Sequence, residues 1–402
     1  MPKTIKAALL GLSALIVVFV IAGGLGVRAA SNTDGAYRQL GVYSEVLSRV
    51  RSEYVEEPDV SQVTNGALHG LLEALDANSS YLTPAEYKQF KEHKGEGKAT
   101  IGAAISKRFG YGAVISVLPN GPAAKAGVES GDIIEAIDGK STREMSLAEL
   151  RSLLGGQQGS NVNLTIVRAR RAEPVKLTVT RDNVNLPPAT DKMLEEGIGY
   201  IKADTLGKGK AQEIAQDIKR LQRAGAKKLI LDLRNSAEGE EQEGVAVANL
   251  FLNHGTIAYV QGQKYPKETF SADASKAVTT LPLVVLVNRG TAGPAEIVAG
   301  AILENARGDV VGDKTFGVGS IQKVIEIPDG SALILSVAKY YTPGGKAIQD
   351  SAITPNILVA DKDDDGALPD EEDNSPQSQA PKPPQEDEQL RRAVEVLKQQ
   401  KA

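Results

Sequence analysis

Apolar residues recur at helical spacing in residues 35–97. They fall at intervals of three and four between Tyr43 and Tyr54, which predicts an amphipathic helix. A second helix is predicted from Val60 to Leu75. A third begins at Thr83-Pro84-Ala85-Glu86, where the threonine can cap, the proline suits the first turn and the glutamate can complete a capping box. We interpret residues 35–97 as an N-terminal helical region with a packing role.

Short apolar runs broken by glycine fill residues 98–185. A short helix is predicted to end at Gly127, because glycine in this position is a common helix stop. Ile133–Ile137 is predicted as a strand, and Asp138-Gly139 as the hairpin turn that follows it. Ser146 can then cap a helix that extends to about Leu154. This stretch is therefore expected to form a small domain of its own.

Strands and helices alternate from residue 186 to residue 360. The predicted strands are Gly197–Lys202, Lys228–Arg234 and Leu283–Asn288, and the predicted helices are Lys208–Ala224, Val245–Leu252 and Ala295–Glu304. A hairpin is expected around Asp329-Gly330. The alternation predicts an α/β core.

The last part of the chain changes composition twice. Residues 361–373 hold eight carboxylates, and the following residues up to 386 are rich in Pro, Gln and Ser. Such a segment cannot bury a core, so 361–386 is predicted to be a solvated, disordered linker. Residues 387–402 return to an amphipathic pattern, with Leu390, Ala393, Val394 and Leu397 on one face of a predicted helix. That helix is either isolated and frayed or a self-association element.

The first 34 residues are predicted to cross or engage a membrane. Lys3 and Lys6 precede an apolar run from Ala7 to Val27, long enough as a helix to span about 32 Å. Lysines on this flank favour a cytoplasmic N-terminus and place the bulk of the chain in the periplasm or outside the cell. Val27-Arg28-Ala29 leaves a cleaved signal peptide as the alternative. The length of the run favours an uncleaved single-pass anchor.

Composition excludes several kinds of chemistry. The net charge of −5 gives no sign of a nucleic-acid partner, and the absence of cysteine excludes disulfides, thiol nucleophiles and thiolate metal sites. His69, His93 and His254 are far apart in the sequence and match no metal or triad spacing. No nucleotide or metal motif is present, so no cofactor is expected.

The segment LPNGPAAKAGVESGDIIEAIDGKS gives residues 98–185 a strong resemblance to PDZ domains. That resemblance implies binding of a protein's free C-terminus, with the peptide added as a strand and its carboxylate held by backbone N–H groups in a loop. The loop would be Thr100-Ile101-Gly102-Ala103. The family usually has glycine first and a large apolar residue last, so Thr100 and Ala103 are departures. A PDZ fold used only as a lid or spacer is the alternative.

A longer resemblance covers residues 36–360. LDANSSYLTPAEY, LILDLRN, VLVNRGTAGPAEIVAGAI, KTFGVGSIQ and AKYYTPGGKAI occur in the order found in carboxyl-terminal processing peptidases, the tail-specific proteases. The resemblance implies an α/β, crotonase-like peptidase core with an inserted PDZ domain. Members of that family cut proteins near their C-termini with a serine nucleophile, a neutral lysine base and a glutamine that orients the lysine.

The positions of that machinery depart from the family pattern here. The nucleophile position falls on Gly293, and the base position falls on Val318. Gln322 is retained four residues later. The loop that helps form the oxyanion hole falls on Ser236-Ala237-Glu238-Gly239, where Glu238 would place a negative charge beside a developing oxyanion. No intact catalytic set is therefore expected.

These departures predict a membrane-anchored pseudoprotease that binds protein C-termini or partners an active peptidase, with self-association also possible. A working peptidase with relocated residues is the alternative, and Thr291 with Lys314 is the candidate pair. A structural envelope protein without a peptide ligand is the third hypothesis.

Overall fold

The computed structural model describes residues 33–93, 99–168, 173–361 and 387–400. The chain divides into two units, Met1–Leu68 and His69–Ala402. The first unit contains α2 (Thr33–Glu53) and the start of α3 (Val60–Glu73), which confirm the first two predicted helices. The predicted span at Ala7–Val27 lies outside the described residues. Within those residues no helix is both long and apolar enough to cross a membrane.

The second unit begins with a helix whose predicted start is confirmed. α4 (Pro84–His93) opens with a capping box, because Thr83 Oγ1 accepts from Glu86 N at 3.3 Å and Glu86 Oε2 accepts from Thr83 N at 2.7 Å. Region 35–97 is not helical throughout, however. β1 (Ser80–Leu82) lies within it and pairs with β20 (Ala332–Tyr341). A three-residue strand is too short to show a period in the sequence.

Residues 99–183 form a small sheet with two helices. The strand order is β3-β4-β5-β7-β8, so β3 is an outer strand, and β6 pairs with β5. The elements are β2 (Ala99–Thr100), β3 (Ala103–Arg108), β4 (Tyr111–Val117), α5 (Pro122–Lys125), β5 (Ile133–Ile137), β6 (Lys140–Ser141), η2 (Thr142–Glu144), α6 (Leu147–Leu154), β7 (Asn161–Val167), β8 (Val175–Thr180) and β9 (Asp182–Asn183). Ser146 caps α6 as predicted, accepting from Glu149 N at 3.1 Å. β2 pairs with β9 at the two ends of this segment.

A six-stranded sheet forms the centre of the larger part, in the order β10-β11-β13-β17-β18-β21. β10 is antiparallel to β11, and the other pairs are parallel. The strands are β10 (Thr190–Met193), β11 (Ile198–Lys202), β13 (Lys228–Asp232), β17 (Leu283–Val287), β18 (Asp309–Gly312) and β21 (Ile357–Leu358), with η3 (Glu195–Gly197) between the first two. This arrangement confirms the predicted α/β core, since β11, β13 and β17 are the three strands read from the sequence.

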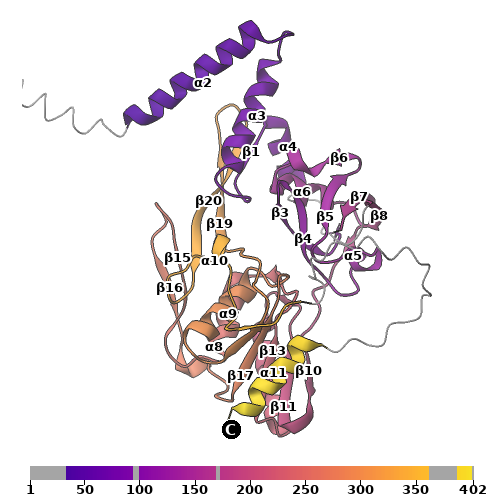
Figure 1. Ribbon diagram of the computed structural model, residues 1–402, viewed down its shortest axis with the longest axis vertical. Helices are drawn as coiled ribbons and strands as arrows, with labels where there is room; N and C mark the ends of the chain where they lie inside the picture. Colours follow the sequence, from indigo (N-terminus) through magenta and orange to yellow (C-terminus); the bar gives the residue numbers. More distant parts are fainter. Residues whose placement is uncertain (1–32, 94–98, 169–172, 362–386, 401–402) are drawn as a thin grey trace, which may run out of the picture. The chain divides into compact units, whose positions relative to one another are not determined.

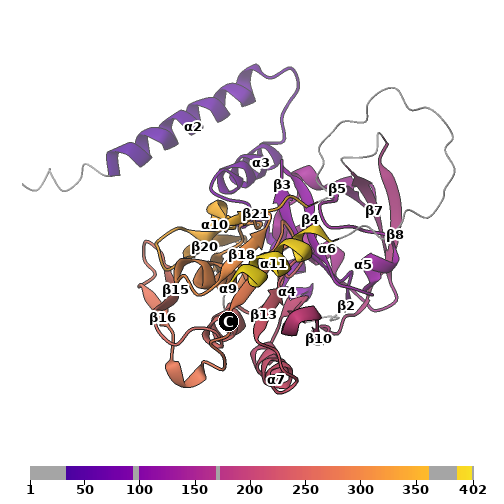
Figure 2. The same ribbon diagram turned by 60° about the horizontal axis from the view of Figure 1, so that its bottom comes forward.

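Both faces of this sheet are covered. α7 (Lys210–Arg223), α8 (Glu241–Asn249) and α9 (Pro294–Glu304) share a core with alternate strand residues such as Leu229, Leu231 and Val285. The other alternate residues of these strands point to the opposite face of the sheet, where α11 (Glu388–Gln399) covers them. They include Ile230, Val284 and Leu286. Figure 1 shows α11 in front of β13 and β17, and Figure 2 shows α7 beside β10. The last helix is therefore a packed layer of the core and not an isolated, frayed helix.

A second sheet contains β1, β20, β15 (Thr256–Gln261) and β16 (Glu268–Ser271) in that order, with β19 (Ser320–Glu326) also paired to β20. The β19–β20 pair confirms the predicted hairpin around Asp329-Gly330. Smaller elements are β12 (Thr205–Leu206), β14 (Glu238–Gly239), η4 (Ala274–Lys276) and α10 (Ile348–Ser351). α8 begins four residues before the predicted start at Val245, because its first turn is polar and the apolar pattern begins only at that valine.

Candidate functional site

The turn between β17 and α9 carries the position where the family nucleophile is expected. Gly293 is the residue before the helix, with φ 58° and ψ −120°, a backbone conformation that side-chain-bearing residues rarely adopt. A Cβ placed there would have only Ala237 O nearby, at 4.0 Å. The turn therefore has the sharp strand-to-helix geometry that exposes a nucleophile in other hydrolases, and it has room for a side chain.

Glu296 organises this turn from the first turn of α9. Its carboxylate is fully buried and accepts hydrogen bonds from Gly293 N (3.0 Å), Gly317 N (2.8 Å), Val318 N (2.8 Å) and Thr315 Oγ1 (2.5 Å). Burial raises the pKa of Glu296 to about 7, and these donors limit the rise. One acid thus joins the turn at Gly293 to the loop at Val318. This role of Glu296 was not predicted from the sequence, because its partners at Gly317 and Val318 lie 21 and 22 residues away.

Val318, at the position of the family's lysine base, belongs to an apolar cluster. It is half-buried against the buried residues Ala292, Ala104 of β3 and Ile115 of β4, and Phe316 and Ala237 pack against the same cluster. Two PDZ-region strands therefore contact the turn and the loop of the candidate site. A cluster of this kind offers no group that could take a proton.

Gln322 stands where the family has the glutamine that orients the base. No hydrogen bond joins its side chain to Val318 in the described residues. Its side chain is exposed, and Nε2 donates to the carbonyl (3.1 Å) and the hydroxyl (2.8 Å) of Ser320. The glutamine is therefore present on β19 without orienting a base.

The loop expected to form an oxyanion hole lies beside the Gly293 turn. Ser236 O accepts a hydrogen bond from Ala292 N at 2.9 Å. Glu238 and Gly239 form β14, which pairs with β12, and a Cβ on Gly239 would lie 2.3 Å from Leu206 O. The glycine is thus required by a close backbone approach. Glu238 is half-buried, and burial raises the pKa of its carboxyl while nearby Arg151 lowers it in part.

The alternative pair Thr291 and Lys314 does not form a catalytic arrangement. Thr291 is fully buried, its hydroxyl donates to Leu233 O at 2.8 Å, and its Oγ1 accepts from Asn288 N at 3.0 Å. Lys314 is exposed. The Thr291 hydroxyl therefore serves the fold of the turn. A second hydroxyl, that of Ser236, is buried and has no hydrogen-bond partner among the described residues.

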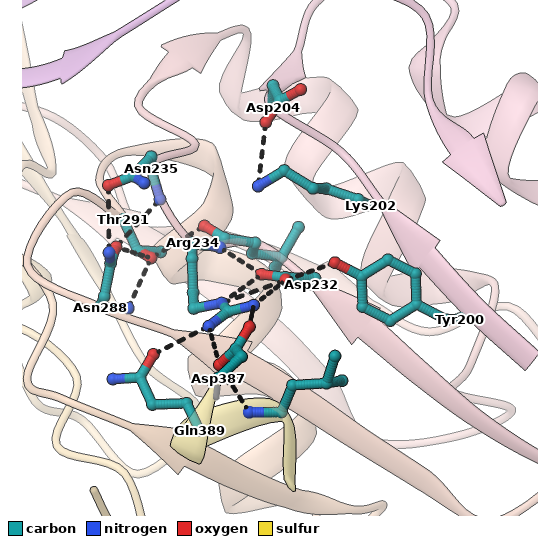
Figure 3. Close-up of polar contacts among 12 residues, drawn as sticks. Tyr200, Lys202, Asp204, Asp232, Arg234, Asn235, Asn288, Thr291, Asp387 and Gln389 are labelled. Carbon is teal, nitrogen blue, oxygen red and sulfur yellow. Dashed lines mark hydrogen bonds and ion pairs between the residues drawn. The ribbon is translucent and has the colours of Figure 1, made fainter. Parts of the chain in front are cut away.

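Arg234 connects this region to the C-terminal helix (Figure 3). Its Nη2 lies 2.6 Å from Asp232 Oδ2 and 2.8 Å from Asp387 Oδ2, while Tyr200 Oη donates to Asp232 Oδ2 at 2.7 Å. Asp387 also caps α11, accepting from Leu390 N at 3.0 Å. The strand β13 thus ends in an ion-pair network that fixes the start of α11, directly before the loop that begins at Asn235.

Asn288 and Asn235 join the two loops of the site. Asn288 Nδ2 donates to Asn235 Oδ1 at 3.0 Å, and Asn288 Oδ1 accepts from Asn235 N at 2.9 Å. Figure 3 shows this pair next to Thr291. A Cβ on Gly290 would lie 2.3 Å from Asn235 Oδ1, which explains the glycine there. The loops at 235–239 and 288–293 therefore form one hydrogen-bonded frame.

The predicted PDZ loop precedes the outer strand β3. Ile101 is buried, and Gly102 has φ 71°. Thr100 Oγ1 accepts from Gly102 N at 3.1 Å. The departure at Thr100 thus occupies one of the N–H groups that would hold a ligand carboxylate. The departure at Ala103 leaves a small, half-buried side chain at the start of β3.

The described residues contain no group of three or more His, Cys, Asp or Glu that could hold a metal ion. His254 is exposed, and His69 makes an edge contact with Tyr81 at a centroid distance of 5.5 Å. No side-chain set described here is arranged for metal chemistry.

Three features define the class to which this chain belongs: a mostly parallel sheet between helices, a sharp turn before α9 and an attached PDZ-like sheet. The peptidase family S41 pattern matches residues 197–359, and the PDZ domain pattern matches residues 114–168. The carboxyl-terminal-processing protease of Picosynechococcus sp. is 34% identical over 371 residues, which are 87% of this chain and 89% of that relative. The chain therefore belongs to the carboxyl-terminal processing protease family, as its sequence motifs predicted.

Two further comparisons agree with this assignment. The carboxy-terminal processing protease CtpA of Bacillus subtilis is 32% identical over 335 residues, 83% of this chain and 71% of that protein. Among solved structures, the photosystem II D1 C-terminal processing protease superposes with a TM-score of 0.65 at 28% identity, covering 79% of this chain and 92% of that one. The mixed α/β fold with a PDZ domain is thus shared with a named protease.

Proposed function

We propose that this family member binds protein C-termini through its PDZ domain and does not cleave them. The observation that carries the proposal is Gly293. The strained turn of a nucleophile is kept, with space for a side chain, but the residue has none. Serine chemistry in a related mechanism loses about 10⁶-fold in kcat when the nucleophile alone is removed.

Two neighbouring positions support the same proposal. Val318 lies in an apolar cluster and can accept no proton, so no base stands at the family position. Glu238 would place a negative charge in the loop that, in the family, stabilises an oxyanion. All three positions of one mechanism are therefore altered together.

Cleavage of an unstructured protein that ends in an apolar residue tests the proposal. The natural chain is expected to give no cleavage above background. Gly293→Ser with Val318→Lys is expected to introduce cleavage, because the apolar cluster would keep the lysine neutral. Adding Glu238→Gly is expected to increase the rate. Cleavage by the natural chain would refute the proposal.

An active peptidase with relocated residues is the second candidate, favoured by the protease names of the relatives. If the natural chain cleaves, Thr291→Ala and Ser236→Ala identify the nucleophile. The Thr291 hydroxyl holds the turn, so its loss would also lower stability. Ser236→Ala removes an unpartnered hydroxyl and is the cleaner variant.

Peptide binding is tested separately from cleavage. A peptide with a free apolar C-terminus is expected to bind more tightly than its amidated form, because amidation removes the charge that the loop at 100–103 would hold. Equal affinity for both peptides contradicts C-terminal recognition. It would leave a lid or spacer role for the PDZ domain, or a structural envelope protein.

Membrane attachment is part of the proposal. The run Ala7–Val27 follows two lysines and is long enough to span a bilayer. N-terminal sequencing of the membrane-bound mature protein is expected to find this segment attached. A mature start at Ala30 or Ser31 would show a cleaved signal instead. A homo-oligomer or an active peptidase relative is the expected protein partner.

A further inference from the structure

Arg151 lies between the two elements that border a PDZ peptide groove. It is on α6, and its guanidinium is partly buried where Nη2 donates to the carbonyl of Ile105 on β3 at 3.2 Å. Among the described strands β3 pairs with β4 alone, so no described strand occupies its other edge, where a peptide strand can add. Arg151 thus donates a hydrogen bond to a carbonyl of β3, the strand beside which a bound peptide would add.

Arg151 also lines a cavity of about 330 Å³ whose other lining residues come from α4, α6, β19, β20 and the segment before β1. Phe90, Leu147, Val324 and Ile334 supply much of its apolar wall. The remaining lining residues are Asn78, Ala148, Ser152 and Gln322, which are uncharged. Among the described residues that line the cavity Arg151 is therefore the one charged group, and an occupant that is complementary to it carries a negative charge.

No acid in the described part of the chain forms an ion pair with Arg151, so its guanidinium can bind a carboxylate of a ligand. In the described part of the chain, none of the ion pairs uses this arginine, although Glu238 is close enough for the arginine to lower its carboxyl pKa. Glu149, on the same helix, does not line the cavity. A guanidinium that bonds a single carbonyl retains several donors in a planar fork suited to a carboxylate.

The direction of β3 gives the register of a bound peptide. A ligand whose terminal carboxylate lies at Gly102-Ala103 runs antiparallel to β3, so that residues farther from its end lie beside later residues of the strand. Ile105 is two positions after Ala103 and so lies near the residue about two before the peptide's end. We propose that Arg151 makes the groove selective for C-termini that carry aspartate or glutamate at about that place. This inference rests on the proposed C-terminal binding.

The proposed selectivity follows from an exchange of hydrogen bonds. A peptide strand that pairs with β3 offers an N–H to Ile105 O, which displaces Arg151. An acidic side chain then gives the displaced guanidinium a charged, two-pronged partner. A neutral or basic side chain gives it none, so part of the arginine's bonding is lost when such a peptide binds.

The full-length protein and short synthetic peptides test this proposal. Peptides ending in Glu-Ala-Val, Gln-Ala-Val and Lys-Ala-Val are compared by calorimetry, together with the amidated Glu-Ala-Val peptide. The Glu peptide is expected to bind about three- to tenfold more tightly than the Gln peptide, and this ratio is expected to fall with added salt. In Arg151→Gln the ratio is expected to approach one. Arg143→Gln is the matched control, because it removes an exposed arginine of the same domain that does not line the cavity.

The outcomes separate this inference from the proposed function. If free-acid peptides bind better than the amidated one but Glu and Gln bind equally, acidic selectivity is wrong and C-terminal binding stands. A preference for Glu that survives in Arg151→Gln assigns the selectivity to another residue and also overturns the inference. If no peptide binds, both the acidic selectivity and the proposed C-terminal binding are wrong. Circular dichroism of both variants checks that loss of discrimination is not loss of folding.

Discussion

The carboxylate of Glu296 accepts a hydrogen bond from Gly293 N at 3.0 Å, and the same oxygen accepts one from Val318 N at 2.8 Å. The two positions that the family resemblance assigns to a nucleophile and a base are therefore held together by one buried acid. The frame of a catalytic site persists in the backbone. The side chains at the two positions that the family resemblance assigns to the nucleophile and the base are those of glycine and valine.

Glu296 is expected to make stability depend on pH. Its pKa of about 7 is above the ordinary value of 4.5, because burial disfavours the charged form. The folded state therefore holds this proton more tightly than the unfolded state. Protonation of Glu296 therefore contributes up to about 3 kcal/mol to the free energy of unfolding. This contribution is fully present below about pH 4.5 and is lost as the pH rises through 7. Urea denaturation of the natural protein and Glu296→Gln at pH 5 and pH 8 measures the effect. A stability difference between the two proteins that is the same at both pH values contradicts it.

Alanine substitutions at Gly293 and Gly290 are expected to differ in cost. Gly293→Ala meets no close atom and is expected to cost about 1–2 kcal/mol from its positive φ alone. Gly290→Ala places Cβ 2.3 Å from Asn235 Oδ1 and 3.0 Å from Asn235 Cα, so the two loops must separate. Its cost is expected to exceed that of Gly293→Ala. Denaturant midpoints of the two variants check the order, and a larger loss at Gly293 would refute it.

Asp387 is expected to stabilise the docking of α11 through two interactions, its ion pair with Arg234 and its capping hydrogen bond with Leu390 N. Substitutions can separate the two. Burial alone would raise the pKa of Asp387, but hydrogen bonds from Arg234 and Leu390 N lower it overall. Asp387→Ala removes both the ion pair and the helix cap, at a cost of about 1–3 kcal/mol for docking of the helix. Asp387→Ser keeps a cap and is expected to recover part of this loss. Hydrogen exchange of the α11 amides measures docking.

Lys398→Ala is the control for that experiment. This lysine pairs with Glu196 at 2.9 Å on the surface, and its removal is expected to change exchange rates little. If Lys398→Ala loosens α11 as much as Asp387→Ala, the anchoring role of the Arg234 network is wrong.

Thr100 is expected to weaken carboxylate binding by the PDZ loop. Its hydroxyl occupies Gly102 N, so Thr100→Val frees that donor without changing the size of the side chain. Affinity for a free-acid peptide is expected to rise about two- to fivefold, with no change for the amidated peptide. Thr178→Val, on the exposed side of β8, is the control. Equal gains for free-acid and amidated peptides would show that the loop does not bind the carboxylate.

Local signals in the sequence were sufficient for most elements. The capping box at Thr83, the cap at Ser146 and the turn at Asp138-Gly139 specify their structure through neighbouring residues alone, and each was predicted correctly. The continuous apolar runs at β13 and β17 predicted strands, and both are buried along most of their length, as such runs are in parallel sheets. The family motifs also predict that Gly293 and Val318 stand where a serine and a lysine are expected, and this remains a prediction.

Other features were decided by contacts between residues far apart in the sequence. The apolar face of α11 was visible in the sequence, but only the folded sheet supplied Ile230, Val284 and Leu286 for that face to cover. The bond from Arg151 to Ile105 joins a helix to a strand 46 residues away and leaves no periodic signal.

The role of Glu296 depends on tertiary structure for the same reason. In the sequence it is an acid in the first turn of a helix, for which a capping role with Gly293 is the expected one. Its bonds to Gly317 and Val318 exist because the fold brings a loop 21 and 22 residues later against the helix. Local hydrogen bonds and hydrophobic periodicity depend on residues that are neighbours in the sequence, so the sequence alone predicts them. Burial and long-range hydrogen bonds depend on residues that become neighbours only in the folded chain.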